Sequence, residues 1–290
     1  MNVSIIVCTY NRAEDLAKVL AQLVDQIAKT SFQIEVLVVD NNSTDNTKDV
    51  VQNYAKQCGT IRYVLEARQG KPYALNMAIG CAQNDWLIFT DDDVVLGDAW
   101  LASVQKVVAA NKTKCFFGKI KSFWQIKEPN WFDERMRSVI VNADHGEKLK
   151  APMNYLVGAN MGIHRDVFKQ CGNFNEHLKR FEDAELSLRV RKHYDIVYVP
   201  DMIVSHPVMM DRLTKKYFRR WYYEMGCFEK FVIDLNDKPF LKMPRWIYRK
   251  CLGHVWGAVI SRQENERFYH ELHLYRFGGL FQTIWGRNIS

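Results

Sequence analysis

The chain has 290 residues, of which 48% are apolar and 25% charged, as in an ordinary soluble globular protein. This composition provides for a sizeable core and argues against disorder. No apolar run approaches the roughly 20 residues that span a bilayer, and no signal peptide is visible, so we expect a cytoplasmic protein. The seven cysteines form no CxxC pair, which favours buried thiols over a disulfide framework or zinc site.

The formal net charge of +7 is concentrated towards the C-terminal end. Residues 212–290 contain 15 Lys and Arg against 7 Asp and Glu, a net of +8, whereas residues 1–211 contain 25 against 26, a net of −1. The same C-terminal part holds 17 of the 37 aromatic residues. A basic and aromatic segment favours an anionic partner, either lipid headgroups or nucleic acid.

Strands and helices are predicted to alternate along the first 90 residues. Short apolar runs predict buried strands at residues 3–8, 34–40, 61–65 and 86–89. Helical spacing predicts a helix over residues 13–27. A second helix is predicted to follow the polar turn at residues 41–45 and to run to about residue 56, and a third is predicted over residues 72–81, with Pro72 near its first turn. This alternation predicts an α/β fold with a parallel sheet covered on both faces.

The rest of the chain reads as mixed and then helical. Strands are predicted near residues 115–120 and 196–199, a helix over residues 184–192, and helices beyond residue 211. No internal repeat or low-complexity segment is apparent.

Polar residues follow three of the predicted strands, at residues 9–12, 40–42 and 91–93. In parallel sheets, ligands bind beyond the carboxyl ends of the strands. Because these ends meet at one edge of a sheet, the three polar clusters predict a single ligand site.

Three consecutive carboxylates, Asp91, Asp92 and Asp93, end the fourth predicted strand. A divalent cation would relieve their mutual repulsion, and Mg²⁺ and Mn²⁺ prefer carboxylate oxygens while keeping positions open for phosphate. A solvated loop or helix cap is the alternative. The two neighbouring polar strand ends favour the metal.

The order of these motifs resembles that of family 2 glycosyltransferases with the GT-A fold. The segments that carry the resemblance are 6–12 (IVCTYNR), 38–45 (VVDNNSTD), 70–76 (GKPYALN), 91–93 (DDD), 158–161 (GANM), 172–176 (GNFNE), 182–183 (ED) and 205–206 (SH). It covers roughly residues 3 to 225. Each motif alone is weak, and their shared order is what makes the resemblance specific.

The resemblance implies a Rossmann-like mixed sheet, mainly parallel and flanked by helices. A GT-A catalytic domain is expected over residues 1–211, with a nucleotide-binding half at about 1–98 and an acceptor half at about 99–211. A helical extension, basic and aromatic, is expected over residues 212–290.

The resemblance also implies a site for a nucleoside-diphosphate sugar and a divalent metal, Mn²⁺ or Mg²⁺. Asp40 would contact the base, Asp91 the ribose or the metal shell, and Asp93 the metal directly. His206 would be a second metal ligand, because a neutral imidazole suits Mn²⁺; a structural histidine is the alternative. The remaining donor contacts are expected from Thr9, Tyr10, Asn11, Arg12, Asn42 and Asp92.

Two loop cations, Arg68 and Lys71, flank Gly70. They are candidates for electrostatic contact with the nucleotide or its phosphates. An ordinary solvated loop pair explains them equally well.

Glu182 and Asp183 begin a predicted helix, where acidic residues commonly act as caps. The family pattern instead implies that Asp183 is the general base and places Glu182 at the acceptor. A base is needed because the acceptor hydroxyl loses its proton as it attacks the anomeric carbon. Direct displacement would invert that carbon, and the metal would stabilise the departing diphosphate.

The run Arg219, Arg220 and Trp221 resembles the RW part of the QxxRW signature of processive members. Tyr217 stands where that signature has Gln, which together with the lack of transmembrane helices argues against a processive polysaccharide synthase. Arg220 is a candidate partner of the diphosphate and Trp221 of the acceptor. An amphipathic helix surface explains both nearly as well.

Two apolar sets recur at helical spacing in the C-terminal extension. They are Tyr248, Leu252, Val255, Trp256 and Val259, and Phe268, Leu272, Tyr275, Phe277 and Phe281. Packing onto the main domain is the common explanation. The excess of Trp, Tyr and Arg favours peripheral binding to the cytoplasmic face of an anionic membrane, which would suit a lipid-linked acceptor.

The sequence therefore predicts an inverting, metal-dependent transfer from a nucleoside-diphosphate sugar to a hydroxyl of a glycan or lipid-linked acceptor. UDP is the favoured nucleotide, with dTDP and GDP open. A nucleotidyltransferase would usually need a Gly-rich loop, and residues 7–15 contain no glycine. A non-catalytic nucleic-acid-binding protein would need a recognised module, and none is seen, so no nucleic acid is expected. An inactive relative is disfavoured by the joint presence of Asp40, Asp91, Asp93, Asp183 and His206.

Overall fold

The computed structural model describes residues 2–30, 32–123, 127–140, 142–208, 210–233, 239–240 and 242–286. The chain forms two compact units, one of residues 1–122 with 143–207 and one of residues 123–142 with 208–290. The sequence pattern gave no sign that residues 123–142 join the C-terminal unit. The expected division of function at residues 211 and 212 stays a prediction.

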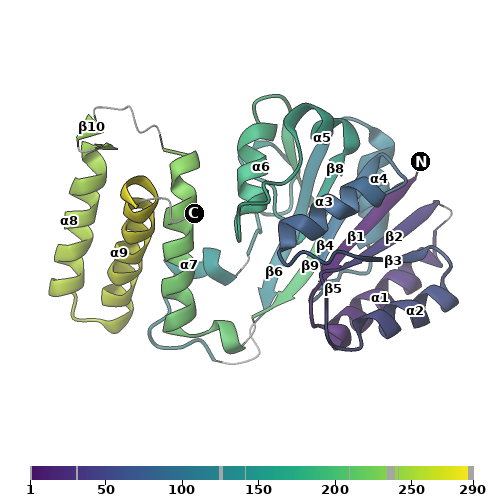
Figure 1. Ribbon diagram of the computed structural model, residues 1–290, viewed down its shortest axis with the longest axis horizontal. Coiled ribbons are helices and arrows are strands. Elements are labelled where there is room, and N and C mark those ends of the chain that lie inside the picture. The colour runs from purple at the N-terminus through teal and green to yellow at the C-terminus, as the bar shows by residue number, and fades with distance from the viewer. Residues whose placement is uncertain are drawn as a thin grey trace. The chain divides into compact units, whose positions relative to one another are not determined.

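The first part of the N-terminal unit alternates strand and helix in the predicted order (Figure 1). Its strands are buried because apolar residues run through them without a break, and β2 is buried along its whole length. The elements are β1 (Val3–Thr9), α1 (Ala13–Ile27), β2 (Ile34–Asp40), α2 (Thr47–Gln57), β3 (Ile61–Leu65), α3 (Lys71–Cys81) and β4 (Trp86–Asp91).

The second part of this unit completes the sheet with mainly antiparallel pairings. Its elements are β5 (Val95–Leu96), α4 (Trp100–Ala110), β6 (Cys115–Phe123), β7 (Lys150–Met153), β8 (Asn160–His164), α5 (Arg165–Cys171), α6 (Glu182–Val190) and β9 (Ile196–Pro207). The predicted strand near residues 196–199 is thus the start of a longer one, which extends to Pro207.

Within the described residues, nine strands form one sheet in the order β3-β2-β1-β4-β8-β6-β9-β5, with β7 paired to β9. The strands β3, β2, β1 and β4 run parallel, and β8 pairs antiparallel with β4. Helices α1 and α2 lie side by side on one face (Figure 1). β2 and β3 lie on one side of β1 in the sheet, whereas β4 lies on the other side. Because right-handed crossovers in opposite directions place their helices on opposite faces, α3 covers the face opposite to α1 and α2. The predicted α/β fold with a sheet flanked by helices is confirmed.

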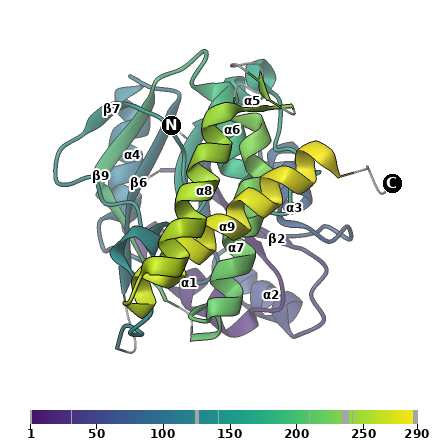
Figure 2. The same ribbon diagram turned by 90° about the vertical axis from the view of Figure 1, so that its left-hand side faces the viewer.

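The C-terminal unit is helical. Besides the segment η1 (Glu134–Ile140), it contains η2 (Met210–Arg212), α7 (Lys215–Phe228), η3 (Glu229–Phe231), β10 (Pro239–Phe240), β11 (Met243–Pro244), α8 (Arg245–Ile260) and α9 (Glu264–Trp285). Helix α9 packs against both α7 and α8 (Figure 2).

Two glycines bring α7 and α9 backbone to backbone. A Cβ atom on Gly226 would lie 1.8 Å from the carbonyl oxygen of Arg276, and one on Gly279 would lie 2.0 Å from that of Tyr223. No larger residue fits at either position without moving the helices apart.

The C-terminal unit has apolar cores of its own. The larger core joins η1 and its preceding loop to α7 and α9, through Phe132, Met136, Val139, Ile140, Val208, Leu213, Phe218, Tyr222, Phe268 and Leu272. A smaller one, of Met243, Ile247, Phe277 and Leu280, lies against α8 and α9. Because the first core draws on both chain segments, residues 123–142 belong to this unit.

The two apolar sets predicted in the extension behave differently. In the second set, Phe268, Leu272 and Phe277 are buried in the cores of the C-terminal unit itself. In the first set, Leu252, Trp256 and Val259 are 68%, 67% and 75% exposed. Packing of either set onto the main domain stays a prediction. No helix among the described residues has the length and apolar character needed to cross a membrane.

Candidate active site

The carboxyl ends of β1, β2 and β4 meet at one edge of the sheet. In the strand register, Thr9 pairs with Asp40 across β1 and β2, and Cys8 pairs with Asp91 across β1 and β4. The predicted convergence of polar strand ends is therefore confirmed. The apolar strands bury the sheet, and the polar residues that follow them are held at its rim.

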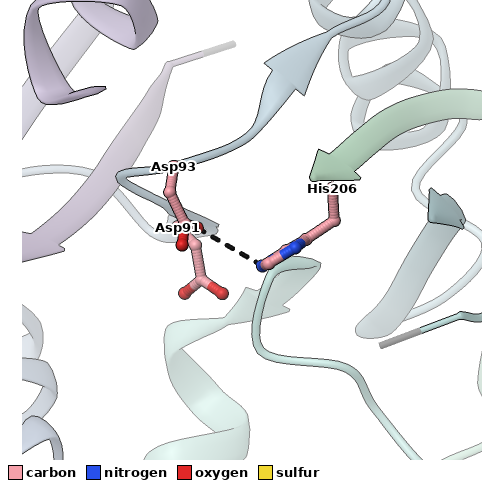
Figure 3. Close-up of side chains that lie close together, drawn as sticks. All are labelled: Asp91, Asp93 and His206. Carbon is pink, nitrogen blue, oxygen red and sulfur yellow. Dashed lines mark ion pairs between the residues drawn. The ribbon is translucent and has the colours of Figure 1, made fainter. Parts of the chain in front are cut away.

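A cluster of two carboxylates and one imidazole forms beside this edge. Asp91 is the last residue of β4, Asp93 comes two residues later, and His206 lies near the end of β9. One ligand atom of each falls within 4.8 Å of the others (Figure 3). Nε2 of His206 lies 3.3 Å from Oδ1 of Asp93. Asp93 and His206 are both buried.

The donor set of this cluster fits a divalent metal. Two carboxylate oxygens and an imidazole nitrogen suit Mn²⁺, and oxygen ligands suit Mg²⁺. Nδ1 of His206 lies 3.0 Å from the carbonyl oxygen of Pro207. A proton held there on Nδ1 leaves Nε2 as the ligand atom, which is the arrangement that metal-binding histidines commonly use.

The acidic run is paired with the guanidinium of Arg12. Nη1 of Arg12 donates to Oδ1 of Asp92 at 3.1 Å and also to Oδ2 of Asp93. Burial raises the pKa of Asp92 to about 6, although the Arg12 guanidinium opposes that shift. Arg12, predicted as a nucleotide contact, thus lies at the site with its guanidinium on the two carboxylates.

The charge of Asp93 also acts on His206. Burial by itself lowers the pKa of His206, but the hydrogen bond and charge of Asp93 outweigh it and raise that pKa above its usual value. A metal ion bound between the two side chains would reverse this effect, because the ligand imidazole must be neutral.

Asp40 is buried at the end of β2 and is fixed by two donors. Its Oδ1 accepts from the Ser43 amide at 2.9 Å, and its Oδ2 accepts from the Tyr63 hydroxyl at 2.8 Å. Burial and the hydrogen bond to Asp40 raise the pKa of Tyr63 to about 12. The structure places Asp40 at the predicted edge, and its contact with a base stays a prediction.

The loops after β1 and β2 are joined through Asn11. Its backbone has φ 51° and its Oδ1 accepts from the Thr44 amide at 2.7 Å. Asn42 also adopts a left-handed conformation, with φ 64°, and both asparagines are exposed, as is Tyr10. Asparagine tolerates this conformation better than most residues. These exposed side chains line the rim where the donor is expected.

Of the two loop cations, Lys71 is the one that reaches the acidic run. Its Nζ lies 2.7 Å from Oδ1 of Asp91. Arg68 instead pairs with Glu66 at 2.9 Å and lies over the Tyr73 ring at 4.5 Å. Contact of either cation with phosphate stays a prediction.

A small pocket opens beside Asp91 and is lined by both acidic residues that begin α6. Its polar wall is Lys71, Asp91, Glu182 and Asp183, and its apolar wall includes Leu75, Phe89, Met161 and Phe174. Burial raises the pKa of Glu182 well above its usual range, with the Lys71 ammonium opposing the shift. Glu182 is therefore less readily ionised than an exposed glutamate.

Asp183 is oriented by two backbone amides. Oδ2 accepts from the Gly158 amide and Oδ1 from the Ala184 amide, each at 2.8 Å. The preceding Phe181 has φ 64°, a conformation that is costly for a bulky residue and is often found at functional sites. The segment 158–161 and the segment 182–183, two motifs far apart in the sequence, thus meet at one carboxylate.

Two predicted site residues, Arg220 and Trp221, lie on α7 in the C-terminal unit. Arg220 forms an ion pair with Glu224, one turn along the same helix, at 2.8 Å. Trp221 packs against the larger core of that unit. Their contacts with diphosphate and acceptor stay predictions.

The sequence prediction missed Asn41, which organises the loop between β3 and α3. Its side-chain amide donates to the carbonyl oxygens of Glu66 and Arg68, and its Oδ1 accepts from the Gly70 amide at 2.8 Å. It is buried, whereas its predicted neighbour Asn42 is exposed. Its position directly after the last residue of a buried strand was the available signal.

Asn76 was missed in the same way. Its amide donates at 3.0 Å to the Phe174 carbonyl and to Oε1 of Glu176, and its Oδ1 accepts from the Phe174 amide. Both partners lie in the segment 172–176. The available signal was that Asn76 lies inside the motif at residues 70–76 without an assigned role, which is consistent with a contact to another motif.

Comparison with solved structures identifies the fold. A mannosyltransferase from Pyrobaculum calidifontis, solved with GDP-Man and Mn²⁺, superposes with a TM-score of 0.62 at 18% identity, covering 98% of this chain and 87% of its own. The likeness assigns the fold, which is GT-A.

The family follows from the sequence match. The family model for Glycosyl transferase family 2 matches residues 4–172, and the chain belongs to that family. It is therefore a glycosyltransferase, as the motif order predicted.

Two curated glycosyltransferases are similar to this chain in sequence over different lengths. Glycosyltransferase AglE of Haloferax volcanii is 27% identical over 221 residues, which is 75% of this chain and 71% of AglE. The GalNAc(5)-diNAcBac-PP-undecaprenol beta-1,3-glucosyltransferase of Campylobacter jejuni is 37% identical over 92 residues, 31% of this chain and 29% of that protein.

Proposed function

We propose that this glycosyltransferase moves a sugar from a nucleoside-diphosphate sugar to a hydroxyl of a glycan or lipid-linked acceptor, with inversion and with a divalent metal. The observation that carries the proposal is the cluster of Asp91, Asp93 and His206 at the strand edge, with the pocket of Glu182 and Asp183 beside it. The residues that would bind the diphosphate through a metal are thus adjacent to the carboxylate that would act as general base toward the acceptor.

Asp93 and His206 would hold Mn²⁺ or Mg²⁺, with Asp91 completing the set or contacting the ribose. When bound, the ion would stabilise the negative charge that develops on the departing diphosphate. Asp92 would stay paired with Arg12, and Lys71 would remain available to the phosphates through its exposed side chain. The cations Arg12 and Lys71 keep the carboxylates close together before a substrate arrives.

The nucleotide would lie along the carboxyl ends of β1 and β2. Asp40 would meet the base, and residues 9–12 with Asn42 would line the nucleotide. The solved mannosyltransferase with GDP-Man supports a nucleoside-diphosphate sugar as donor. We take UDP as the first candidate, because a fixed carboxylate at Asp40 fits a pyrimidine base, and GDP and dTDP as the next.

In the transfer step, the acceptor oxygen attacks the anomeric carbon while Asp183 takes its proton. The bond between that carbon and the diphosphate oxygen breaks, and the nucleoside diphosphate leaves with the electron pair. The two amide donors at Gly158 and Ala184 hold the Asp183 carboxylate in place for this role. Attack opposite the leaving group inverts the anomeric carbon.

The acceptor class rests on the relatives. The Campylobacter jejuni relative is named for a glycan on a polyprenol diphosphate, and a relative from Nostoc is a beta-monoglucosyldiacylglycerol synthase. The first name describes a glycan carried by a lipid, and the second describes a lipid that bears a sugar. We therefore propose a lipid-linked glycan as the acceptor to test first, with Glu182 and Trp221 as its contacts.

The test is calorimetric titration of UDP into the protein with and without Mn²⁺, repeated on Asp93→Ala. We expect binding that Mn²⁺ strengthens and that Asp93→Ala weakens by more than about tenfold, since the substitution removes a direct ligand. Asp98→Ala is the matched control, because Asp98 is an exposed carboxylate in the turn before α4.

The same titrations with GDP and dTDP decide the nucleotide. Failure of all three nucleotides to bind in the presence of Mn²⁺ would contradict the proposed donor. Equal weakening by Asp93→Ala and Asp98→Ala would contradict the metal site while leaving the nucleotide site standing.

A further inference from the structure

Helix α8 presents a continuous apolar surface to solvent. Leu252, Trp256 and Val259 are more than two thirds exposed, and Val255 and Ile260 are also exposed. Single exposed apolar residues are normal on a protein surface. Five of them within nine residues of one helix form a patch of the kind that marks an interaction site.

The five residues lie on the same side of α8. Their spacing of three, four, seven and eight positions places them on one helical stripe. The opposite side packs against α9, where Ile247 is fully buried and a Cβ on Gly257 would lie 2.4 Å from the His270 ring (Figure 2). The close contact fixes α8 on α9 with its apolar stripe facing outward.

The exposed side of α8 is basic where it is not apolar. Arg245, Arg249 and Lys250 in its first half are all exposed, and residues 245–260 contain no Asp or Glu. Nζ of Lys250 lies 4.8 Å from the centre of the Trp246 ring. The helix therefore has a cationic half with one exposed Trp, followed by an apolar half with another.

We propose that α8 docks this protein on a membrane surface that contains anionic lipids. The apolar half, from Leu252 to Ile260, enters the boundary between headgroups and acyl chains. Arg245, Arg249 and Lys250 pair with anionic headgroups, and Trp246 lies at the same level.

This charge pattern favours lipid over the other occupants of an apolar face. A second copy of the chain would bring its own three cations and no carboxylate from α8, so a symmetric contact would leave those cations without partners. Nucleic acid would supply phosphates for the basic half but no apolar region for the other half. Anionic lipid supplies both.

The test is flotation of the full chain with vesicles of phosphatidylcholine alone and of phosphatidylcholine with phosphatidylglycerol. We expect binding to the anionic vesicles, lowered by more than about tenfold in the double variant Leu252→Ser with Trp256→Ser, since each loses an inserted apolar side chain. Arg249→Gln with Lys250→Gln should remove the preference for anionic vesicles and leave a weaker, salt-insensitive binding.

A matched single pair controls for loss of surface apolarity in general. Leu252 is 68% exposed and Leu149, in the N-terminal unit, is 63% exposed. Leu252→Ser should weaken vesicle binding and Leu149→Ser should not, and neither should change the thermal melting curve because neither side chain is in a core. Quenching of Trp256 fluorescence by brominated lipids, compared with Trp256→Phe, should show insertion to the level of the upper acyl chains.

Three results would overturn the proposal. The first is no binding of the wild-type chain to either vesicle, and the second is equal binding by Leu252→Ser and Leu149→Ser. The third is a lipid-free dimer that the double variant converts to a monomer, which would make the face an interface between copies. None of these measurements uses a sugar nucleotide, so they stand apart from the test of the proposed reaction.

Discussion

The side chain of Asp183 is held more firmly than a helix cap requires. A cap needs one backbone donor, whereas this carboxylate accepts from Gly158 in a distant loop and from Ala184 in its own helix. A Cβ on Gly158 would lie 3.3 Å from Oδ2 of Asp183, so the loop leaves just enough space for the carboxylate. Such fixed orientation is what a general base needs.

Replacing Asp183 by asparagine tests that role. We expect Asp183→Asn to lower kcat by about a hundredfold or more, because the amide has nearly the same shape but cannot take the acceptor proton. KM for the donor should stay within about a few-fold of the wild-type value, because the substitution leaves the donor-binding residues in place. The measurement is the rate of nucleoside diphosphate release at saturating acceptor.

The matched control is Asp195→Asn, the same chemical change on an exposed turn after α6. A kcat for Asp183→Asn equal to that of Asp195→Asn would contradict the assignment of the base. The test would then move to Glu182, the other carboxylate in the pocket.

At the residue scale, the meeting of Asp91, Asp93 and His206 was predictable only through a family resemblance. The strand pattern placed Asp91 and Asp93 at a sheet edge by physical reasoning alone. His206 lies on β9, which pairs antiparallel with β5 and β7. The apolar pattern of the sequence did not predict these pairings. The ion pairs of Arg12 with Asp92 and Asp93 were not predictable, because they depend on which way a long side chain turns.

At the element scale, prediction succeeded where strands are continuous apolar runs. The predicted runs at residues 34–40 and 61–65 coincide with β2 and β3, and the helix at 13–27 coincides with α1. β8 was missed because its sequence NMGIH has neither an apolar run nor an alternation, and β7 because KAPM is short and exposed. Such strands are specified by their neighbours in the sheet.

The contact between α8 and α9 contains a cluster of histidines, from which we expect the C-terminal unit to be sensitive to acid. The rings of His254 and His273 stack with centroids 4.2 Å apart, and Nδ1 of His254 lies 3.0 Å from Nδ1 of His270. Burial, together with His254, Arg276, His270 and Arg135, lowers the pKa of His273 from 6.5 to about 3. The folded protein thus resists a proton that the unfolded chain accepts.

The sign of the pH dependence follows from linkage. Because the pKa of His273 is lower in the folded state, its contribution to stability is complete above pH 6.5 and is lost as the pH falls towards 3. We expect His273→Phe, which keeps an aromatic ring but cannot titrate, to reduce the loss of thermal stability on acidification. The measurement is Tm from about pH 7.5 to about pH 4.5 for both proteins.

His193→Phe serves as the control, since His193 is exposed in the N-terminal unit. It should leave the slope of Tm against pH unchanged. A slope for His273→Phe equal to that of the wild type would show that acid acts elsewhere in the chain.

At the scale of the whole molecule, the two compact units have separate cores. Residues 123–142 reach the C-terminal unit through contacts far apart in sequence, such as Arg135 with Glu266 at 2.8 Å and over the Tyr269 ring at 3.8 Å. Composition located the change of character near residue 211, but no local pattern reveals a contact between segments more than 100 positions apart. The chain passes between the two units three times, after residues 122, 142 and 207, and such a boundary could not be predicted from periodicity.

Separate cores predict separate losses of stability. Phe218 is fully buried in the larger core of the C-terminal unit, so Phe218→Ala should cost about 3–5 kcal/mol there. We expect hydrogen exchange to become faster in η1, α7 and α9, while β1, β2 and β4 keep their protection. Binding of a nucleoside diphosphate should be unchanged, because the proposed site of Asp40, Asp91 and Asp93 belongs to the N-terminal unit.

The mirror experiment is Phe116→Ala, which removes a fully buried ring from β6 in the N-terminal unit. It should speed exchange in the sheet and weaken nucleotide binding, while α7 and α9 keep their protection. If either substitution accelerates exchange equally in both units, the chain unfolds as one cooperative body and the separate cores do not act as separate folding units. If the two patterns are complementary, changes to α8 and its membrane face can be made without disturbing the proposed catalytic edge.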